Sequence, residues 1–175
     1  MTDPASVPTF SLAMTVAFSI ALLGSVILKF WLATRQIHHV AQHRSTVPAA
    51  FADRITLDAH QKAADYTIAQ GRLGLLELAW GTAVTLAWTL LGALSELNQA
   101  LAQWMAPGIA QQVALLAAFA VVNAVIDLPF TLYRTFVLEQ RFGFNKTTVS
   151  LWLKDLAKST VLSIVIGLPL AALVL

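Results

Sequence analysis

The chain has 175 residues, of which 58% are apolar and only 11% charged, whereas soluble domains carry about 25% charged residues. This composition excludes an ordinary soluble domain and predicts an integral membrane protein. Cysteine is absent, which excludes a disulfide framework and a cysteine metal cage. The net charge of +2 is small, and no basic patch interleaved with aromatic residues is present, so no nucleic-acid partner is expected.

Four long apolar runs predict the membrane spans, because a helix needs about 20 residues to cross about 30 Å of hydrocarbon. They cover residues 9–31, 73–94, 113–137 and 158–175. No Lys or Arg precedes the first run, which argues against a cleaved signal peptide. The predicted fold class is therefore all-α, a polytopic membrane helical bundle with four transmembrane helices.

The basic residues give the orientation of these spans. All 11 lie at the ends of spans that face the segments 34–72 and 138–157, or within those segments. Because Lys and Arg are retained on the cytoplasmic side, both segments are predicted to be cytoplasmic, with the N-terminus and the loop 95–112 outside. We expect a multi-pass protein whose first partner is the lipid bilayer, located in a bacterial inner membrane.

The first cytoplasmic segment predicts a juxtamembrane helix. Thr56 suits its N-cap, and Asp58 would lie near the positive end of the helix dipole. Leu57, Ala64 and Ile68 would form one apolar face. Such a helix rests on the bundle or on headgroups, and a dedicated binding surface is the alternative.

Among the polar residues inside the predicted spans, Glu77, Asn123 and Asp127 are the candidates for a function. Intramembrane ionisable groups are costly and are candidates for function. Asn123 and Asp127 are four residues apart, so they share one side of the third helix. Two interpretations follow. One is an ion or proton path, and the other is an interhelical contact that fixes packing, with Glu77 or a backbone group freed by Pro129 as partner.

The stretch 126–158 carries the most distinctive pattern, IDLPFTLYRTFVLEQRFGFNKTTVSLWLKDLAK. It resembles the N-terminal membrane domain of the CAAX prenyl protease 1 family. The residues that carry the resemblance are Leu128, Pro129, Tyr133, Thr135, Phe136, Val137, Glu139, Gly143, Phe144, Asn145, Thr148, Leu151, Asp155 and Lys158. Looser similarity upstream involves Arg35, Gln36, Val47, Pro48, Phe51, Lys62, Ala63 and Tyr66.

The resemblance implies a membrane zinc metalloendopeptidase whose helices surround a chamber. Its zinc site uses HExxH on a helix, in which two His bind the metal and the Glu activates water. No His in this chain is followed by Glu. His39 and His43 have the i, i+4 spacing, but they lack a third ligand. We therefore expect no catalytic or metal site in this chain, and zinc in a C-terminal part of the same protein.

The turn EQRFGFNK between the third and fourth spans is the candidate docking motif, formed by Glu139, Arg141, Gly143, Phe144 and Asn145. Gly143 predicts a turn, and Asn145 suits the cap of the next helix. By resemblance, this loop borders the cytoplasmic mouth of the chamber. Docking of a substrate or a following domain and a purely structural turn both remain open.

The predicted function is the N-terminal transmembrane domain of a CAAX prenyl protease 1 type metalloendopeptidase. It would supply anchoring and chamber wall for the cleavage of a membrane-associated polypeptide substrate, and would be inactive alone. Two alternatives stand beside it. The first is a stand-alone, non-catalytic membrane scaffold, and the second is a small transporter or sensor subunit that uses Asp127.

Overall fold

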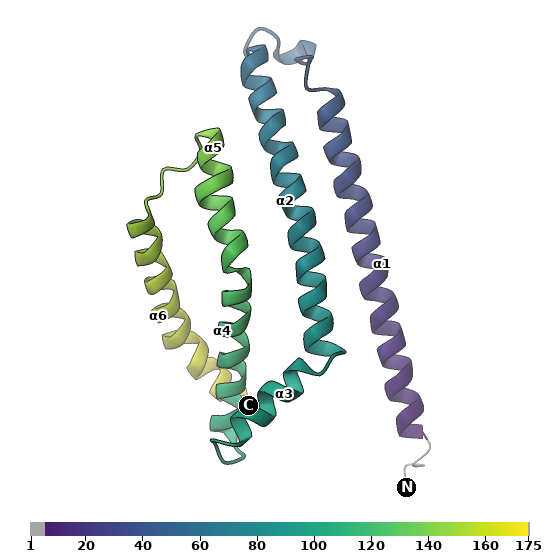
Figure 1. Ribbon diagram of the computed structural model, residues 1–175, viewed down its shortest axis with the longest axis vertical. Coiled ribbons are helices and arrows are strands. Elements are labelled where there is room, and N and C mark those ends of the chain that lie inside the picture. Colours follow the sequence, from purple (N-terminus) through teal and green to yellow (C-terminus); the bar gives the residue numbers. More distant parts are fainter. Residues whose placement is uncertain (1–5, 175) are drawn as a thin grey trace. The chain divides into compact units, whose positions relative to one another are not determined.

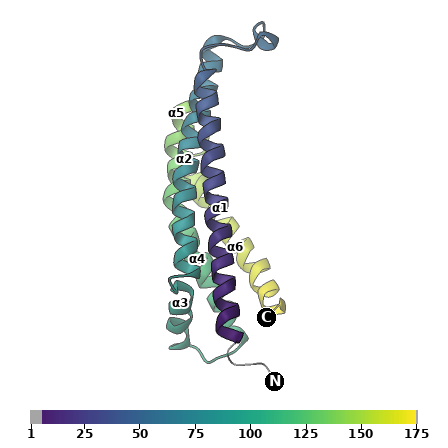
Figure 2. The same cartoon turned by 90° about the vertical axis from the view of Figure 1, so that its right-hand side faces the viewer.

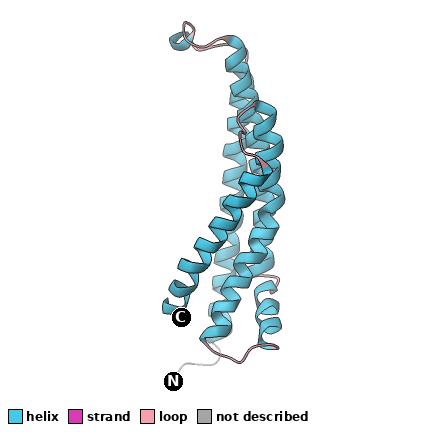
Figure 3. Cartoon of the chain, turned by 90° about the vertical axis from the view of Figure 1, so that its left-hand side faces the viewer, coloured by secondary structure: helices cyan, strands magenta, loops and turns pink. Residues whose placement is uncertain are grey.

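The computed structural model describes residues 6–174, and all regular structure among them is helical, as Figure 3 shows. The all-α prediction is confirmed. Residues 1–5 of the predicted outer tail lie outside the described residues. The chain divides into two compact units, Met1–Thr82 and Ala83–Leu175.

The first unit is a helical hairpin. It contains α1 (Ser6–Gln42), the short 3-10 turn η1 (Ala49–Phe51) and most of α2 (Leu57–Thr89). The two long helices run side by side in Figures 1 and 2. They approach closely at Gly71, where an added Cβ would lie 2.8 Å from Cγ1 of Ile37. With 37 residues, α1 is about 55 Å long, so it extends well beyond a hydrocarbon layer of about 30 Å.

The N-cap predicted at Thr56 is confirmed. Thr56 Oγ1 accepts a hydrogen bond from the backbone N–H of Ala59 at 3.2 Å, the bond expected of an N-cap. The predicted juxtamembrane helix is not a separate element, however. It continues without interruption into the second apolar run as α2, because no Pro or positive-φ residue interrupts the chain between Leu57 and Thr89.

The second unit contains the end of α2, α3 (Ala93–Ala102), α4 (Ile109–Tyr133), η2 (Arg134–Glu139), α5 (Gln140–Phe142) and α6 (Val149–Val174). In Figure 1, α3 lies against the start of α4, and α6 returns along α4. Gly92 separates α2 from α3 with φ at +81°, a conformation that favours glycine. The predicted second span, 73–94, therefore runs past the end of its helix.

Three described helices are long and apolar enough to cross a membrane, and the bent pair α2 and α3, at 53°, would make a fourth. The predicted number of spans agrees with the larger count. The last helix begins at Val149, earlier than the predicted 158, so it includes the basic residues Lys154 and Lys158. Few residues are buried in the described part of the chain. They are all apolar: Ala64, Leu73 and Leu138. The outer faces of these helices are thus left for acyl chains or further protein to cover.

Candidate functional site

A π-helical turn marks the point where the third span meets the predicted docking motif. Pro129 lies inside α4 and has no N–H to donate, so the regular hydrogen-bond ladder is disturbed around it. The N–H of Arg134 is shared between the carbonyl oxygens of Phe130 and Thr131. The helix then widens into η2, a deformation that is frequent at functional sites. The helix thus continues past Pro129, and a π-helical turn follows it.

The chain leaves this helix through a Schellman turn at Gly143. Gly143 has φ at +78°, and its N–H donates to the carbonyl of Gln140 at 3.0 Å. The N–H of Phe144 donates to the carbonyl of Glu139 at 2.9 Å. These two bonds satisfy carbonyl groups at the end of the helix. The predicted turn at Gly143 is therefore present, and its geometry requires a residue that tolerates positive φ.

The cap of the last helix differs from the prediction. Asn145 Oδ1 accepts a bond from the N–H of Thr147 at 2.6 Å, which makes a local turn rather than a helix cap. Thr148 Oγ1 accepts from the N–H of Leu151 at 3.2 Å and is the N-cap of α6. The prediction for Asn145 was wrong because Asn, Ser and Thr all suit both roles, and two such positions follow each other closely here.

The charged and aromatic side chains of the motif differ in exposure. Arg141 and Phe144 are exposed and Glu139 is half-buried, and the Arg141 guanidinium lies 5.9 Å from the ring centroid of Phe142. Within residues 6–174, the Glu139 carboxylate has no hydrogen-bond or ionic partner. Phe136 meets the ring of Trp152 edge-on at 6.2 Å, which holds the start of α6 against η2. The motif is a hydrogen-bonded turn with an exposed cation, Arg141, and a half-buried carboxylate, Glu139, that has no partner among residues 6–174.

Asn123 forms an interhelical contact in the second unit. Its Oδ1 accepts a hydrogen bond from Trp88 Nε1 at 3.2 Å, and its Nδ2 donates to the carbonyl of Phe119 at 2.7 Å. The ring of Trp88 also lies 4.9 Å from that of Phe119. Of the two interpretations, the structure thus shows a packing contact for Asn123, with Trp88 as partner. Sequence reasoning missed Trp88, although the need of a buried indole N–H for an acceptor is a usable signal.

Asp127 does not join this contact. Its carbonyl accepts from Thr131 Oγ1 at 3.2 Å, its side chain is exposed, and the carboxylate has no partner among the described residues. Asn123 and Asp127 share a side of α4, as predicted, but only Asn123 is engaged. Glu77 is half-buried on α2 in the first unit.

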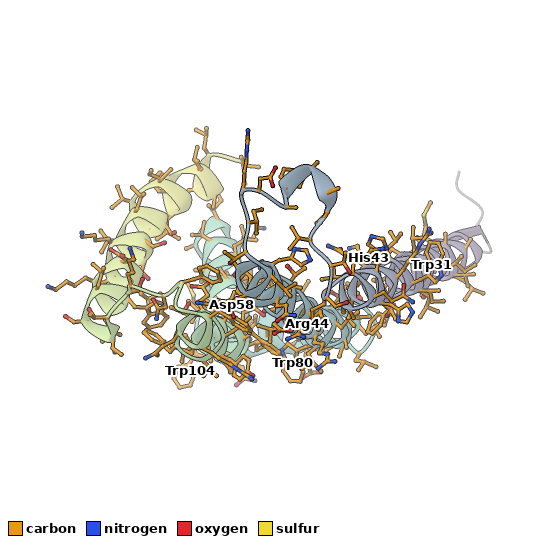
Figure 4. All side chains as sticks on the ribbon, turned by 90° about the horizontal axis from the view of Figure 1, so that it is seen from above. Trp31, His43, Arg44, Asp58, Trp80 and Trp104 are labelled. Atoms are coloured by element: carbon orange, nitrogen blue, oxygen red, sulfur yellow. The ribbon has the colours of Figure 1, made fainter. Side chains whose placement is uncertain are left out.

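A polar cluster that the sequence did not predict closes the hairpin of the first unit. Arg44 binds Asp65 through two bonds, Nε to Oδ1 at 2.6 Å and Nη2 to Oδ2 at 2.8 Å. These hydrogen bonds, with the charge of Asp65, raise the pKa of Arg44. His60 Nε2 donates to the carbonyl of His43 at 3.0 Å. Figure 4 shows Arg44 between α1 and α2. The residues are too far apart in sequence for periodicity to connect them.

The histidines do not fit a zinc site. The rings of His39 and His43 are 4.2 Å apart, and His43 Nδ1 lies 2.8 Å from the carbonyl oxygen of His39. A carbonyl can only accept, so that nitrogen carries a proton and is not a metal ligand in this arrangement. Among the residues that the structure describes, no three His, Asp or Glu side chains are grouped so that they could hold a metal ion.

Comparison with known proteins shows which proteins this chain is similar to. The family profile described as "CAAX prenyl protease N-terminal, five membrane helices" matches residues 36–175. CAAX prenyl protease 1 of Saccharomyces cerevisiae is 30% identical over 170 residues, which cover 90% of this chain and 36% of the relative. The human CAAX prenyl protease 1 homolog is 37% identical over 67 residues, 38% of this chain and 14% of that protein.

The fold has a relative among solved structures. The crystal structure of S. mikatae Ste24p aligns with a TM-score of 0.78 at 26% identity and covers 87% of this chain and 36% of that chain. The chain thus spans about a third of the length of the yeast proteins that it matches along most of its own length. The five membrane helices in the description of the family exceed the three or four found among residues 6–174.

Proposed function

This chain belongs to the CAAX prenyl protease family, as its N-terminal membrane domain, and from this membership we propose that it anchors and encloses the chamber of a membrane zinc metalloendopeptidase. The supporting observation is the match of residues 36–175, which includes the π-helical turn and the Gly143 turn. Residues 6–174 contain no group of His, Asp or Glu that could hold a metal ion, and in this proposal zinc and the water-activating Glu belong to another part of the protein.

The docking motif has a specific role in this proposal. Glu139 and Arg141 stand on a turn fixed by two backbone hydrogen bonds, so their charges are presented in a defined geometry. We propose that they pair with groups of the catalytic part at the cytoplasmic mouth of the chamber. Asp127, exposed at membrane depth, would face the water of that chamber, where a carboxylate is hydrated rather than in contact with acyl chains. The substrate would be a membrane-associated polypeptide.

Orientation and location complete the proposal. The segments 34–72 and 138–157 would be cytoplasmic, and the N-terminus and the loop 95–112 outside, because Lys and Arg are retained on the cytoplasmic side. The location proposed is a bacterial inner membrane, for which the same charge bias holds. Fractionation of the source cells tests it.

The deciding experiment combines the sequence of the encoding locus beyond Leu175 with a peptidase assay and zinc analysis of the longest intact product. We expect a downstream HExxH, stoichiometric zinc and cleavage that a chelator abolishes. A product without zinc and without cleavage would refute the protease proposal and leave a non-catalytic membrane scaffold. Ion flux through vesicles that contain this chain alone, abolished by Asp127→Asn, would instead support the transporter alternative.

A further inference from the structure

The face of α1 that points away from α2 changes from apolar to basic at the inner end of the first span. Half-buried Ala33, Ile37 and Val40 mark the side that packs toward α2. At 100° per residue, Trp31, Arg35 and His38 lie on the opposite side, and all three are exposed. Ile27 and Leu28 continue this exposed face toward the membrane centre, with 68% and 54% of their surface accessible. The face is therefore amphiphilic along the helix axis.

Arg35 is the permanent positive charge of this face. Its guanidinium carbon lies 5.5 Å from the ring centroid of Trp31, a cation–π arrangement that holds the side chain while its N–H groups remain available. The described helix α1 contains no Asp or Glu, and Arg35 forms no ion pair with any residue in the described range. Residues 6–174 therefore provide no anion to pair with Arg35.

The polar end of the face is hollowed. An open hollow of about 590 Å³ is lined by Leu32, Arg35, Gln36, His38, His39 and Gln42. The amide Nε2 of Gln42 lies 2.9 Å from His38 Nε2, which fixes the imidazole at its rim. The hollow thus combines one cation with neutral hydrogen-bonding groups, and Leu32 connects it to the apolar surface below.

We propose that this face of α1 is a specific site for an anionic phospholipid. The phosphate would bind Arg35 in the hollow, because guanidinium matches phosphate geometry with paired N–H donors. The acyl chains would lie along Leu32, Leu28 and Ile27. A soluble anion would use only the polar end of the site, whereas a phospholipid uses both ends. The site goes beyond the proposed proteolysis and does not depend on it.

Lipid selectivity of the intact protein tests this inference. The protein is incorporated into nanodiscs that contain equal amounts of phosphatidylglycerol and phosphatidylcholine, and retained lipid is counted by native mass spectrometry. We expect one preferentially retained phosphatidylglycerol, and a fall of about fivefold in its preference over phosphatidylcholine in Arg35→Gln, since one cation at the membrane surface contributes about that much attraction. Arg35→Lys, which keeps the charge, should retain most of the preference.

The matched control is Arg54→Gln, because Arg54 is also exposed and basic but lies in the loop before α2. This variant should keep the preference. An unchanged preference in Arg35→Gln, or an equal loss in Arg54→Gln, would overturn the proposal. Inorganic phosphate at millimolar concentration should not displace the lipid. Displacement by phosphate would mean a simple anion site without the acyl contacts. Loss of zinc or of peptidase activity would not affect the result, so the two proposals fail separately.

Discussion

Trp88 and Asn123 join α2 to α4 through a hydrogen bond of 3.2 Å from the indole nitrogen to the amide oxygen. Interhelical hydrogen bonds in membranes contribute about 0.6 kcal/mol on average and at most about 1.7 kcal/mol. We expect Trp88→Phe, which keeps the contact with Phe119, to destabilise the domain by about that amount. A double-mutant cycle with Asn123→Ala, followed by unfolding in detergent, measures the coupling.

The control for this cycle is Trp104→Phe, since Trp104 is 87% exposed. It should leave the free energy of unfolding unchanged within error. Additive effects of Trp88→Phe and Asn123→Ala would contradict a direct bond between the two side chains.

Gly143 is the residue on which the docking turn depends, because its φ is +78°. Gly143→Ala forces a Cβ into the left-handed region at a cost of about 1–2 kcal/mol, and Gly143→Asn should cost less. Gly167→Ala is the control, as Gly167 lies in α6 and nothing is within 4 Å of an added Cβ. Thermal unfolding of the intact protein measures the difference. Equal stability of the alanine variants would contradict the role of the turn.

Close packing of α1 against α2 predicts that alanine is tolerated less well at Gly71 than at Gly74. At Gly71 an added Cβ meets Cγ1 of Ile37 at 2.8 Å, whereas at Gly74 nothing lies within 4 Å. Both substitutions to Ala should gain helix propensity, but Gly71→Ala must also displace Ile37, at about 1–3 kcal/mol. We expect Gly71→Ala to unfold at a lower temperature than Gly74→Ala. The pair Gly71→Ala with Ile37→Val should recover part of the loss.

The sequence predicts the structure correctly where the signal is local. It does not predict contacts between residues that are far apart in the chain. The apolar runs, the Thr56 cap and the turn at Gly143 each depend on a few consecutive residues, and each is present. The ion pair of Arg44 with Asp65 joins residues 21 positions apart, and the bond of Trp88 with Asn123 joins residues 35 apart. Such contacts depend on how helices meet, which periodicity does not specify. Asn145 and Thr148 show a second reason why a prediction can be wrong. Both side chains can cap a helix, so the sequence does not specify which of the two is the N-cap of α6.

Membrane orientation can be measured directly, since these 175 residues contain no cysteine and an introduced thiol is the one reactive thiol among them. Arg54→Cys and Lys146→Cys should react with an impermeant maleimide only after the cytoplasmic side is exposed. Ser95→Cys should react from the outside. Labelling of Arg54→Cys and Lys146→Cys from opposite sides would refute the proposed topology.

Asp127 and Val125 distinguish a chamber wall from a surface in contact with lipid, because both side chains are exposed and they lie on nearly opposite sides of α4. If Asp127 faces chamber water, Asp127→Cys in the intact protein should react with a hydrophilic thiol reagent, since thiolates form only where water is present. Val125→Cys should resist that reagent, because a thiol surrounded by acyl chains stays protonated. Resistance of both would place Asp127 against protein or lipid, and Asp127→Leu should then increase stability by removing a carboxylate that costs about 2.5–3.5 kcal/mol at the membrane centre.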